Sequence, residues 1–442
     1  MPHDFTLGVA TAAYQIEGTT LGTCGPSHWD SFARRGGTHK GHDGAVACAH
    51  YTHWEADLDL IKSGGFNAYR FSTAWPRIFP DGASGQANAQ GLDFYDRLVD
   101  GCLTRGLDPH LTLYHWDLPQ SLADEGGWEN SDIAHWFADY ATTVAARLGD
   151  RVASIATINE PWCVAWLSHY LDHHAPGKAD LPAAAKAMHN VLYAHGTAVS
   201  ALRAQGTLGG DNIGIVLNME YAQPASDSAA DQRAATTHDG IYNRWFIQAL
   251  TQATYPGDIL PHLAPHMPTG WQDQMGVIAQ PLDWMGLNYY TRSIHADDGT
   301  GQFPYNRPVI GPLPKTDMGW EIYPQGLEYF LTRMHRDYTG DLPLYVTENG
   351  MAGADTMAPK IQDDTRIDYF DSHLRAVRAA MDNGAPVRGY FAWSLLDNFE
   401  WAFGYDKRFG IVYVDYATQQ RIPKASFHAL RQMADDIIIQ HP

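Results

Sequence analysis

Short apolar runs alternate with longer amphipathic segments along the 442-residue chain, and this alternation constrains the fold more than any other feature. The runs that predict strands are Thr6–Ala10, Asn67–Ser72, Pro109–Leu113, Ser154–Asn159, Ile213–Asn218, Trp284–Asn288, Leu344–Thr347 and Arg388–Trp393. Strands joined by a helical crossover of about a dozen residues or more pair in parallel. The pattern therefore predicts the α/β class and a single (β/α)8 TIM barrel, with residues 1–442 as one domain and the active site at the C-terminal ends of the strands.

Between these strands, apolar residues recur at three- and four-residue steps, which predicts helices. The predicted helices are Tyr51–Ser63, Gly91–Arg105, Ile133–Leu148, Pro182–Ala204, Thr237–Ala253, Tyr323–Tyr338 and Thr365–Asn383. Gly64 follows the first of them and Gly384 the last, as expected at helix C-termini. The Gly- and Pro-rich stretch Asp297–Pro314 is the longest predicted loop, and an insertion here in a barrel shapes a cleft rather than divides domains.

Net charge and composition narrow the choice of partner. The chain has 30 basic and 50 acidic residues, a formal net charge of −20, and no basic cluster offsets this charge locally. Nucleic acid and anionic membranes are therefore not expected partners. The 14 Trp, 23 Tyr and 16 Phe exceed what packing alone needs, and aromatic faces suit sugar rings, although ordinary packing accounts for most of them.

The cysteines and histidines predict neither a disulfide framework nor a metal site. The four cysteines are widely spaced without a C-x-x-C motif, and pairs such as His50/His53 and His173-His174 lack an accompanying cysteine or carboxylate signature. The N-terminus lacks a basic and then apolar leader, and no apolar run reaches the roughly 18 residues of a membrane span. We therefore expect a cytoplasmic protein that uses no cofactor.

Two glutamates stand where a predicted strand passes into a loop. Glu160 lies in the segment Thr157–Pro161 (TINEP), and Glu348 lies in Val346–Gly350 (VTENG). A carboxylate at such a position is held rigidly and still faces the open end of a barrel. Two carboxylates across one cleft are the minimal machinery for cleaving a glycosidic bond. The sequence therefore predicts a glycosidase.

Other polar and aromatic residues gather at the C-terminal ends of the same strands. They are Gln15, Arg70, His115, Trp116, Asn159, Asn288, Tyr290, Trp393, Glu400 and Trp401. In a parallel barrel all of these strand ends meet on one face. Each residue alone is more often structural, but together they indicate a polar binding site.

At these positions the chain resembles glycoside hydrolase family 1, the retaining β-glycosidases. The resemblance rests on four further blocks in the family's order, which are Phe5–Gly18, Asn67–Ile78, Tyr114–Pro119 and Trp393–Trp401. It implies a retaining β-glucosidase that removes terminal non-reducing β-D-glucosyl residues, and by extension galactosyl or fucosyl residues, from small glycosides and oligosaccharides. Cellulose degradation falls within that range, and small glycosides are the implied partners.

The resemblance also implies roles for individual residues. Glu160 becomes the acid/base and Glu348 the nucleophile. Arg70, Tyr290 and Asn288 support the nucleophile, and donors around Glu348 are expected to lower the pKa of its carboxyl group. The implied glycone clamp is Gln15, His115, Glu400 and Trp401, with Trp393 as the stacking floor. The other implied sugar-binding residues are Asn159 for the 2-hydroxyl, Trp116, and Trp320 as the aglycone platform.

The sequence departs from the family pattern in a few places and leaves three further functions open. One departure is Phe5–Gly8, which lacks the tryptophan common before that glycine. Ser168 and Asp172 stand where many members have glycine, which affects loop shape and aglycone fit. A 6-phospho-β-glucosidase is disfavoured by Glu400, which would repel a sugar phosphate, although Lys407 and Arg408 lie nearby. The same scaffold also accommodates a non-catalytic sugar-binding protein or a metal-dependent barrel enzyme. Oligomeric state is left open.

Overall fold

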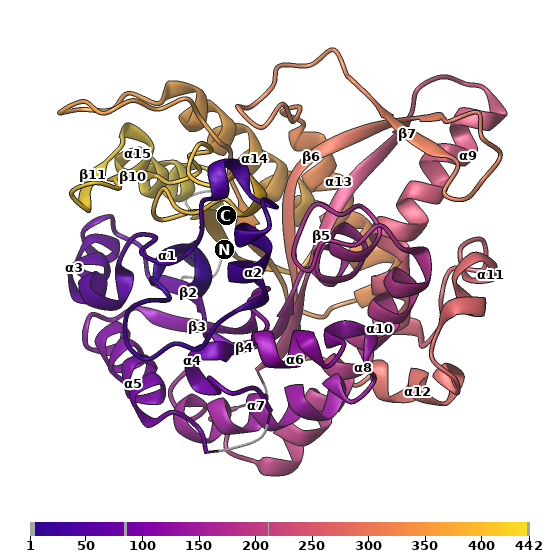
Figure 1. Cartoon of the computed structure of the whole chain (residues 1–442). Helices are drawn as coiled ribbons and strands as arrows, with labels where there is room; N and C mark the ends of the chain where they lie inside the picture. The colour runs from indigo at the N-terminus through magenta and orange to yellow at the C-terminus, as the bar shows by residue number, and fades with distance from the viewer. Residues whose placement is uncertain (1–4, 84–85, 211, 440–442) are drawn as a thin grey trace.

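Eight parallel strands close into a barrel in the computed structural model, which describes residues 5–83, 86–210 and 212–439 (Figure 1). The barrel strands are β1 (Thr6–Ala10), β2 (Ala68–Ser72), β3 (Asp108–Tyr114), β4 (Ser154–Asn159), β5 (Ile213–Pro224), β6 (Trp284–Asp297), β8 (Leu344–Asn349) and β9 (Val387–Trp393). Neighbours pair in chain order and β9 pairs back onto β1, so that the sheet closes. The predicted (β/α)8 TIM barrel and all eight predicted strands are confirmed.

Helices surround this barrel. The longer ones are α3 (His50–Ser63), α5 (Ala89–Thr104), α7 (Ile133–Leu148), α8 (Leu181–Gln205), α9 (Ala229–Asp239), α10 (Trp245–Gln252), α12 (Trp271–Ile278), α13 (Pro324–Met334), α14 (Asp364–Asp382) and α15 (Ala425–Ala434). Short helices in the loops are α1 (Ala13–Ile16), α2 (His28–Arg34), α4 (Trp75–Ile78), α6 (Gln120–Asp124) and α11 (Leu260–Leu263). Within the described ranges, none of the helices combines the length and apolar character needed to span a bilayer.

The amphipathic pattern of α7 shows how a helix is held on the barrel. Ile133, Phe137, Tyr140 and Val144 recur at three- and four-residue steps and are fully buried. Each such side chain contributes about 1.5–3 kcal/mol through its removal from water. The Tyr140 ring stacks on Trp75 at 4.8 Å, and its hydroxyl donates to the Leu113 carbonyl at 2.8 Å. The helix thus fixes the C-terminal end of β3, where the site begins.

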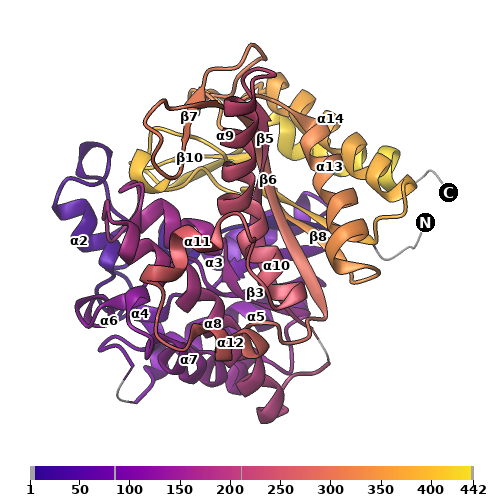
Figure 2. The same cartoon turned by 90° about the vertical axis from the view of Figure 1, so that its right-hand side faces the viewer.

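The prediction that Asp297–Pro314 forms a loop is wrong in part. This segment contains strand β7 (Asn306–Val309), which pairs antiparallel with β6. Strands β5 and β6 also continue past their predicted ends and pair with each other as far as Pro224 and His295. Figure 2 shows them rising together beside α9. These extensions carry polar, half-exposed residues, so a search for apolar runs ends each strand too early.

The predicted helix Thr237–Ala253 is in fact three segments, α9, a π-helical turn at Gly240–Arg244, and α10. The wide turn places the Asn243 side chain against the backbone of Glu220 on β5. Its amide nitrogen donates to the Glu220 carbonyl at 2.9 Å, and its oxygen accepts from the Glu220 N–H at 3.1 Å. A π turn inside a helix is tolerated where such a contact compensates it.

Candidate active site

Glu160 and Glu348 lie at the C-terminal ends of β4 and β8, as predicted. Glu348 is the fifth residue of β8, and Glu160 follows β4 directly in a left-handed conformation with φ 52°. Their side chains are almost entirely withdrawn from solvent, and the exposed fractions of the two residues are 5% for Glu160 and 3% for Glu348. A non-glycine residue at positive φ is uncommon and marks a backbone held by its surroundings.

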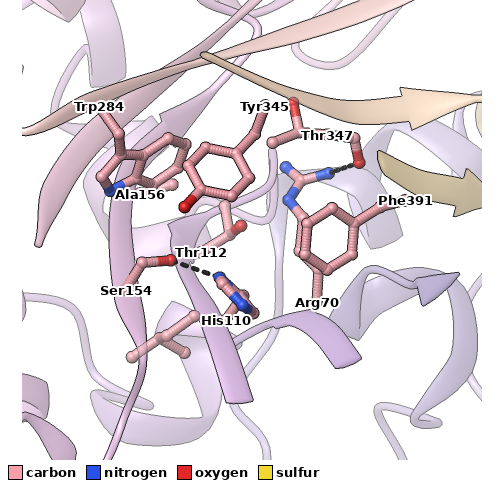
Figure 3. A pocket seen from close by; sticks show the side chains of 10 residues that line it. Arg70, His110, Thr112, Ser154, Ala156, Trp284, Tyr345, Thr347 and Phe391 are labelled. Atoms are coloured by element: carbon pink, nitrogen blue, oxygen red, sulfur yellow. Dashed lines mark hydrogen bonds between the residues drawn. The ribbon is translucent and has the colours of Figure 1, made fainter. Parts of the chain in front are cut away.

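Two donors hold the carboxylate of Glu348. Arg70 on β2 pairs its Nη1 with Oε1 at 2.6 Å, and the Tyr290 hydroxyl donates to Oε2 at 2.7 Å. Arg70 is itself fixed, since it donates to the Thr347 carbonyl at 3.1 Å and to Asn159 Oδ1 at 2.7 Å. Figure 3 shows Arg70 among the residues that line a small cavity in the barrel interior, with its bond to Thr347 drawn. A charge-assisted pair of this kind orients a carboxylate strongly.

Glu160 is held by neutral donors only. Asn288 on β6 donates its amide to Oε1 at 2.6 Å, and the Cys163 thiol donates to Oε2 at 3.0 Å. The Asn288 amide is oriented by Thr347, whose hydroxyl donates to Asn288 Oδ1 at 2.7 Å. The same amide donates to Asn159 Oδ1 at 3.1 Å, so Asn288 links Glu160 to the Arg70–Glu348 pair through Asn159.

The two carboxyl groups also affect each other's ionisation. Burial and the charge of Glu348 raise the pKa of Glu160 to about 8. Burial also raises the pKa of Glu348, against the opposing effects of Arg70 and Tyr290. The predicted lowering of the Glu348 pKa is therefore wrong, because removal from water outweighs its donors. Since Arg70 pairs directly with Glu348 alone, the negative charge rests there and Glu160 holds the proton.

We expect kcat/KM for a glycoside with a poor leaving group to fall as pH rises through about 8, where Glu160 loses its proton. The protonated form is the active one, so the rate is fully present below that pH and drops about tenfold per unit above it. A pH–rate profile measures this limb. The pKa of Glu400 is also raised to about 8 by burial, so Glu160→Gln on an activated aryl glucoside serves as the control. A limb of unchanged position and steepness in that variant contradicts the assignment, whereas a shallower limb that remains belongs to Glu400.

The predicted glycone clamp comes together around His115. The imidazole of His115 stacks at 5.6 Å on Trp393 and at 6.0 Å on Trp401, with interplanar angles of 17° and 13°. Trp116 packs against Trp401 at 4.7 Å, and its indole N–H donates to the backbone carbonyl of Asn159 at 2.9 Å. An aromatic wall of this kind, with polar edges, suits a sugar ring.

Gln15 and Glu400 supply the polar side of the clamp. The Gln15 amide nitrogen donates to the Phe399 carbonyl at 2.8 Å and lies 3.5 Å from Glu400 Oε2. Gln15 Oε1 and His115 Nδ1 are buried and lack a hydrogen-bond partner among the residues that the structure describes. Buried polar atoms are almost always satisfied, so these two are the groups expected to bind substrate hydroxyls.

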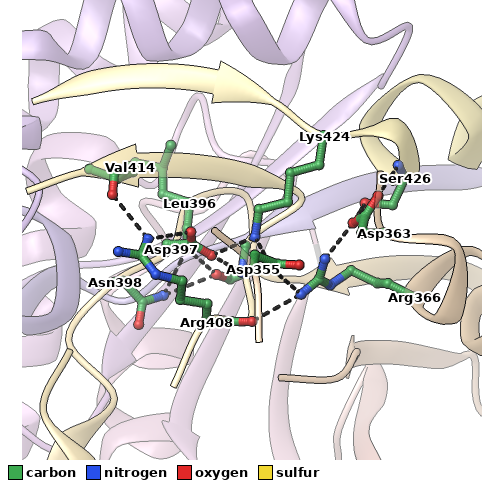
Figure 4. Close-up of polar contacts among 12 residues, drawn as sticks. Asp355, Asp363, Arg366, Leu396, Asp397, Asn398, Arg408, Val414, Lys424 and Ser426 are labelled. Carbon is green, nitrogen blue, oxygen red and sulfur yellow. Dashed lines mark hydrogen bonds and ion pairs between the residues drawn. The ribbon is translucent and has the colours of Figure 1, made fainter. Parts of the chain in front are cut away.

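A buried ion network holds the loop that carries Glu400 (Figure 4). Asp397 is fully buried and pairs with Arg408 at 2.7 Å and with Lys424 at 2.8 Å. Its neighbour Asn398 accepts from the Gln15 amide at 3.0 Å. The clamp thus rests on side chains from the C-terminal part of the chain, which explains how a loop positions a carboxylate firmly.

Trp320, Asp172 and Ser168 are the remaining residues for which the sequence gives an expectation. Trp320 is half-buried and packs against Tyr290 at 5.6 Å, beside Glu348. Asp172 has φ 58°, a left-handed conformation that glycine adopts freely and aspartate tolerates. Ser168 has a right-handed backbone with φ −90°, a conformation that does not require glycine. Its hydroxyl donates to the Val164 carbonyl. All of the predicted catalytic and sugar-binding residues therefore belong to one connected cluster.

Cys163 is a further residue of the site that no sequence motif identifies. Its thiol bonds to Glu160 and accepts from the Asn218 amide at 3.6 Å. The spacing of Cys163 could have indicated its role in the sequence. A residue three positions after Glu160 lies on the same side of a helical turn as Glu160.

We expect Cys163→Ala to move the alkaline limb of the pH–rate profile upward. The thiol donates to the charged form of Glu160 and lowers the pKa of that carboxyl group, so its loss raises the pKa further. Cys163→Ser keeps a donor and is the matched control. The kcat/KM profiles of the two variants make the comparison, and an unchanged or downward limb in the alanine variant rules out this role.

A (β/α)8 barrel with two buried, interacting glutamates at the C-terminal ends of its strands belongs to the class of two-carboxylate glycoside hydrolases. The sequence model of glycosyl hydrolase family 1 matches residues 1–436. A β-glucosidase from Agrobacterium sp. is 48% identical over 96% of this chain and 93% of its own length. A bifunctional β-D-glucosidase/β-D-fucosidase from Bifidobacterium breve is 42% identical over 98% of each chain.

The fold agrees with this relationship. The solved structure of a β-glucosidase from Thermotoga maritima in complex with glucoimidazole superposes with a TM-score of 0.94, at 42% identity and over 98% of both chains. The chain belongs to glycosyl hydrolase family 1, and it is an enzyme that hydrolyses glycosidic bonds.

Proposed function

We propose that this protein is a retaining β-glucosidase that releases terminal non-reducing β-D-glucosyl residues from small glycosides and oligosaccharides. Glu348 is the nucleophile and Glu160 the acid/base in this proposal. The observation that carries it is the asymmetry of the pair, in which Arg70 contacts Glu348 while only neutral donors contact Glu160. The family match and the named relatives support the substrate class.

In the first step, a carboxylate oxygen of Glu348 attacks the anomeric carbon while the bond to the aglycone oxygen breaks. Glu160 donates its proton to that oxygen, so the aglycone leaves as a neutral alcohol. The product is an ester between the sugar and Glu348. Arg70 and Tyr290 keep the attacking carboxylate ionised and oriented. In this proposal Asn159 binds the sugar 2-hydroxyl, a contact that strengthens as positive charge develops.

In the second step, Glu160 acts as a base. Esterification removes the negative charge of Glu348, which is one cause of the raised Glu160 pKa, so the deprotonated form of Glu160 becomes more favourable. Glu160 then takes a proton from water, the water oxygen attacks the anomeric carbon, and Glu348 leaves as a carboxylate. Two displacements at one carbon restore its configuration. Measurement of the first-formed anomer by proton NMR tests this, and an α-anomer from a β-glucoside overturns the proposal.

The surroundings of Glu400 favour sugars without phosphate. The two cations that a phosphate would need are engaged elsewhere, since Lys407 pairs with Asp317 at 3.0 Å and Arg408 pairs with Asp397 at 2.7 Å. The named relatives likewise include a β-glucosidase and a β-glucosidase/β-fucosidase. Glucosides are the proposed substrates, with fucosides and galactosides as further ones.

We expect p-nitrophenyl β-glucoside to be hydrolysed at least about 100-fold faster, in kcat/KM, than its 6-phosphate, because the phosphate would leave water for a buried site whose nearby cations, Lys407 and Arg408, are already paired. Steady-state kinetics on both substrates measure the ratio. Equal rates, or preference for the phosphate, would favour a 6-phospho-β-glucosidase. Binding of glucosides without release of nitrophenol would instead favour a non-catalytic sugar-binding protein.

Two further expectations belong to this proposal. The described cysteines are free thiols, which supports a reducing compartment such as the cytoplasm.

A family model that runs from residue 1 to 436 supports a single domain.

A further inference from the structure

Three side chains that could hold a metal ion meet outside the active site, on the extension of the sheet. Glu220 comes from β5, His238 from α9 and His295 from the far end of β6. One ligand atom from each lies within 4.8 Å of the others. The three segments are brought together by the β5–β6 pairing and by α9 packed against it (Figure 2).

His295 is the unusual member of the cluster. Only 3% of the residue is exposed, and neither ring nitrogen makes a hydrogen bond of normal geometry with any described residue, although the Asn306 side chain lies close by. Its ring stacks on that of His238 with centroids 3.8 Å apart. Buried polar atoms without partners are rare, and two on one imidazole call for an explanation other than packing.

The charges around the cluster favour a cation. His238 Nε2 lies 2.8 Å from Glu220 Oε1, so the carboxylate already faces the imidazole. The nearby carboxylates of Asp239 and Asp297 are engaged by Arg333 and Arg233, at 2.7 Å in each case. Glu220 is therefore the anionic group directed at the two imidazoles, and a bound dication would balance its charge.

We propose that Glu220, His238 and His295 form a binding site for a divalent transition-metal ion, with Zn²⁺ as the ion of best fit. Two imidazoles and one carboxylate form a ligand set that Zn²⁺ favours, and the fourth position is left for water. Ligand atoms around Zn²⁺ lie roughly 3.4 Å apart. Because the two rings stack with their planes 26° apart, His238 has to turn out of the stack, and Glu220 with it, before the three ligand atoms can converge on one ion at that spacing.

A bound ion would cross-link α9 to strands β5 and β6. Binding at Nε2 of a neutral His238 moves the ring proton to Nδ1, which leaves Nε2 free as a ligand. An ion that binds the folded chain and not the unfolded one stabilises it. Mg²⁺ and Ca²⁺ prefer oxygen ligands, so they are expected to have no such effect.

Isothermal titration of tag-free protein with ZnCl₂ tests the proposal. We expect one high-affinity site per chain, with binding weakened at least about 100-fold in Glu220→Gln and in His238→Asn, since changes merely adjacent to metal ligands already cost 10–100-fold. His262→Asn is the matched control, because this half-buried histidine stacks on Phe303 at 4.4 Å and is not a member of the cluster. Circular dichroism of each variant verifies the fold.

A spectroscopic measurement separates the cluster from other histidines. Co²⁺ in place of Zn²⁺ gives visible absorption bands typical of tetrahedral coordination, and these should disappear in His238→Asn but not in His262→Asn. Equal Zn²⁺ affinity in all variants, or an absence of Zn²⁺ binding to wild type, overturns the proposal and leaves the cluster as an ion pair with a stacked histidine. Neither outcome depends on glycosidase activity.

Discussion

Replacing Glu348 with alanine is expected to lower kcat for every β-glucoside by about 10⁶-fold, the size of loss seen when a covalent nucleophile is removed. No other carboxylate of the cluster is paired with Arg70 in the part of the chain that the structure describes, so no neighbour is oriented to take over the attack on the anomeric carbon. Rates with p-nitrophenyl β-glucoside and with cellobiose measure the loss. It should be equally severe for both, because the first step needs the nucleophile whatever the leaving group.

Azide provides the control for this variant. The space left by the carboxylate admits a small anion, which can attack the anomeric carbon of a glucoside with a good leaving group. We expect the product to be α-glucosyl azide, since only one displacement takes place. Glu400→Ala is the matched variant, because it removes a buried carboxyl group of the same site that has no nucleophilic role in the proposal. Retention of more than a few per cent activity in Glu348→Ala contradicts the assignment.

Replacing Glu160 with alanine is expected to act selectively on the leaving group. For cellobiose, whose leaving alcohol needs a proton, we expect a loss of about 10²–10⁴-fold. For 2,4-dinitrophenyl β-glucoside the first step should stay near the wild-type rate, since this leaving group departs as an anion. Pre-steady-state release of dinitrophenol measures that step as a burst, followed by slow turnover because the base of the second step is missing.

Asn288→Ala gives a comparison for the Glu160 variant. It removes the 2.6 Å bond to Glu160 but leaves the proton donor in place, so its effect should depend much less on the leaving group. If Glu160→Ala slows both kinds of substrate to the same extent, Glu160 is not the general acid.

The sequence predicts the barrel well because its signals are local. Each strand such as β4 is a short apolar run with a helix on either side, and Glu160 and Glu348 follow directly from where those runs end. A parallel barrel then brings strand ends together without further information. The site residues could be placed on one face for the same reason.

What the sequence does not predict depends on contacts between distant segments. The pKa of Glu348 is raised rather than lowered because burial, which a motif does not reveal, exceeds the effect of Arg70. The extensions of β5 and β6 carry polar residues, and their pairing with each other is not visible in an apolar pattern. Residues 220, 238 and 295 meet through that pairing, and their spacing matches none of the familiar metal motifs.

Trapping the covalent intermediate tests the central claim most directly. The reagent is 2,4-dinitrophenyl 2-deoxy-2-fluoro-β-glucoside. Its fluorine at C2 slows both steps by opposing positive charge on the sugar, while its dinitrophenyl leaving group keeps the first step fast. The 2-fluoroglucosyl ester of the enzyme should therefore accumulate. Peptide mass spectrometry is expected to find one fluoroglucosyl group per chain, on Glu348. A label on any other residue, or full turnover of ordinary glucosides with inversion and without a label, would contradict the account.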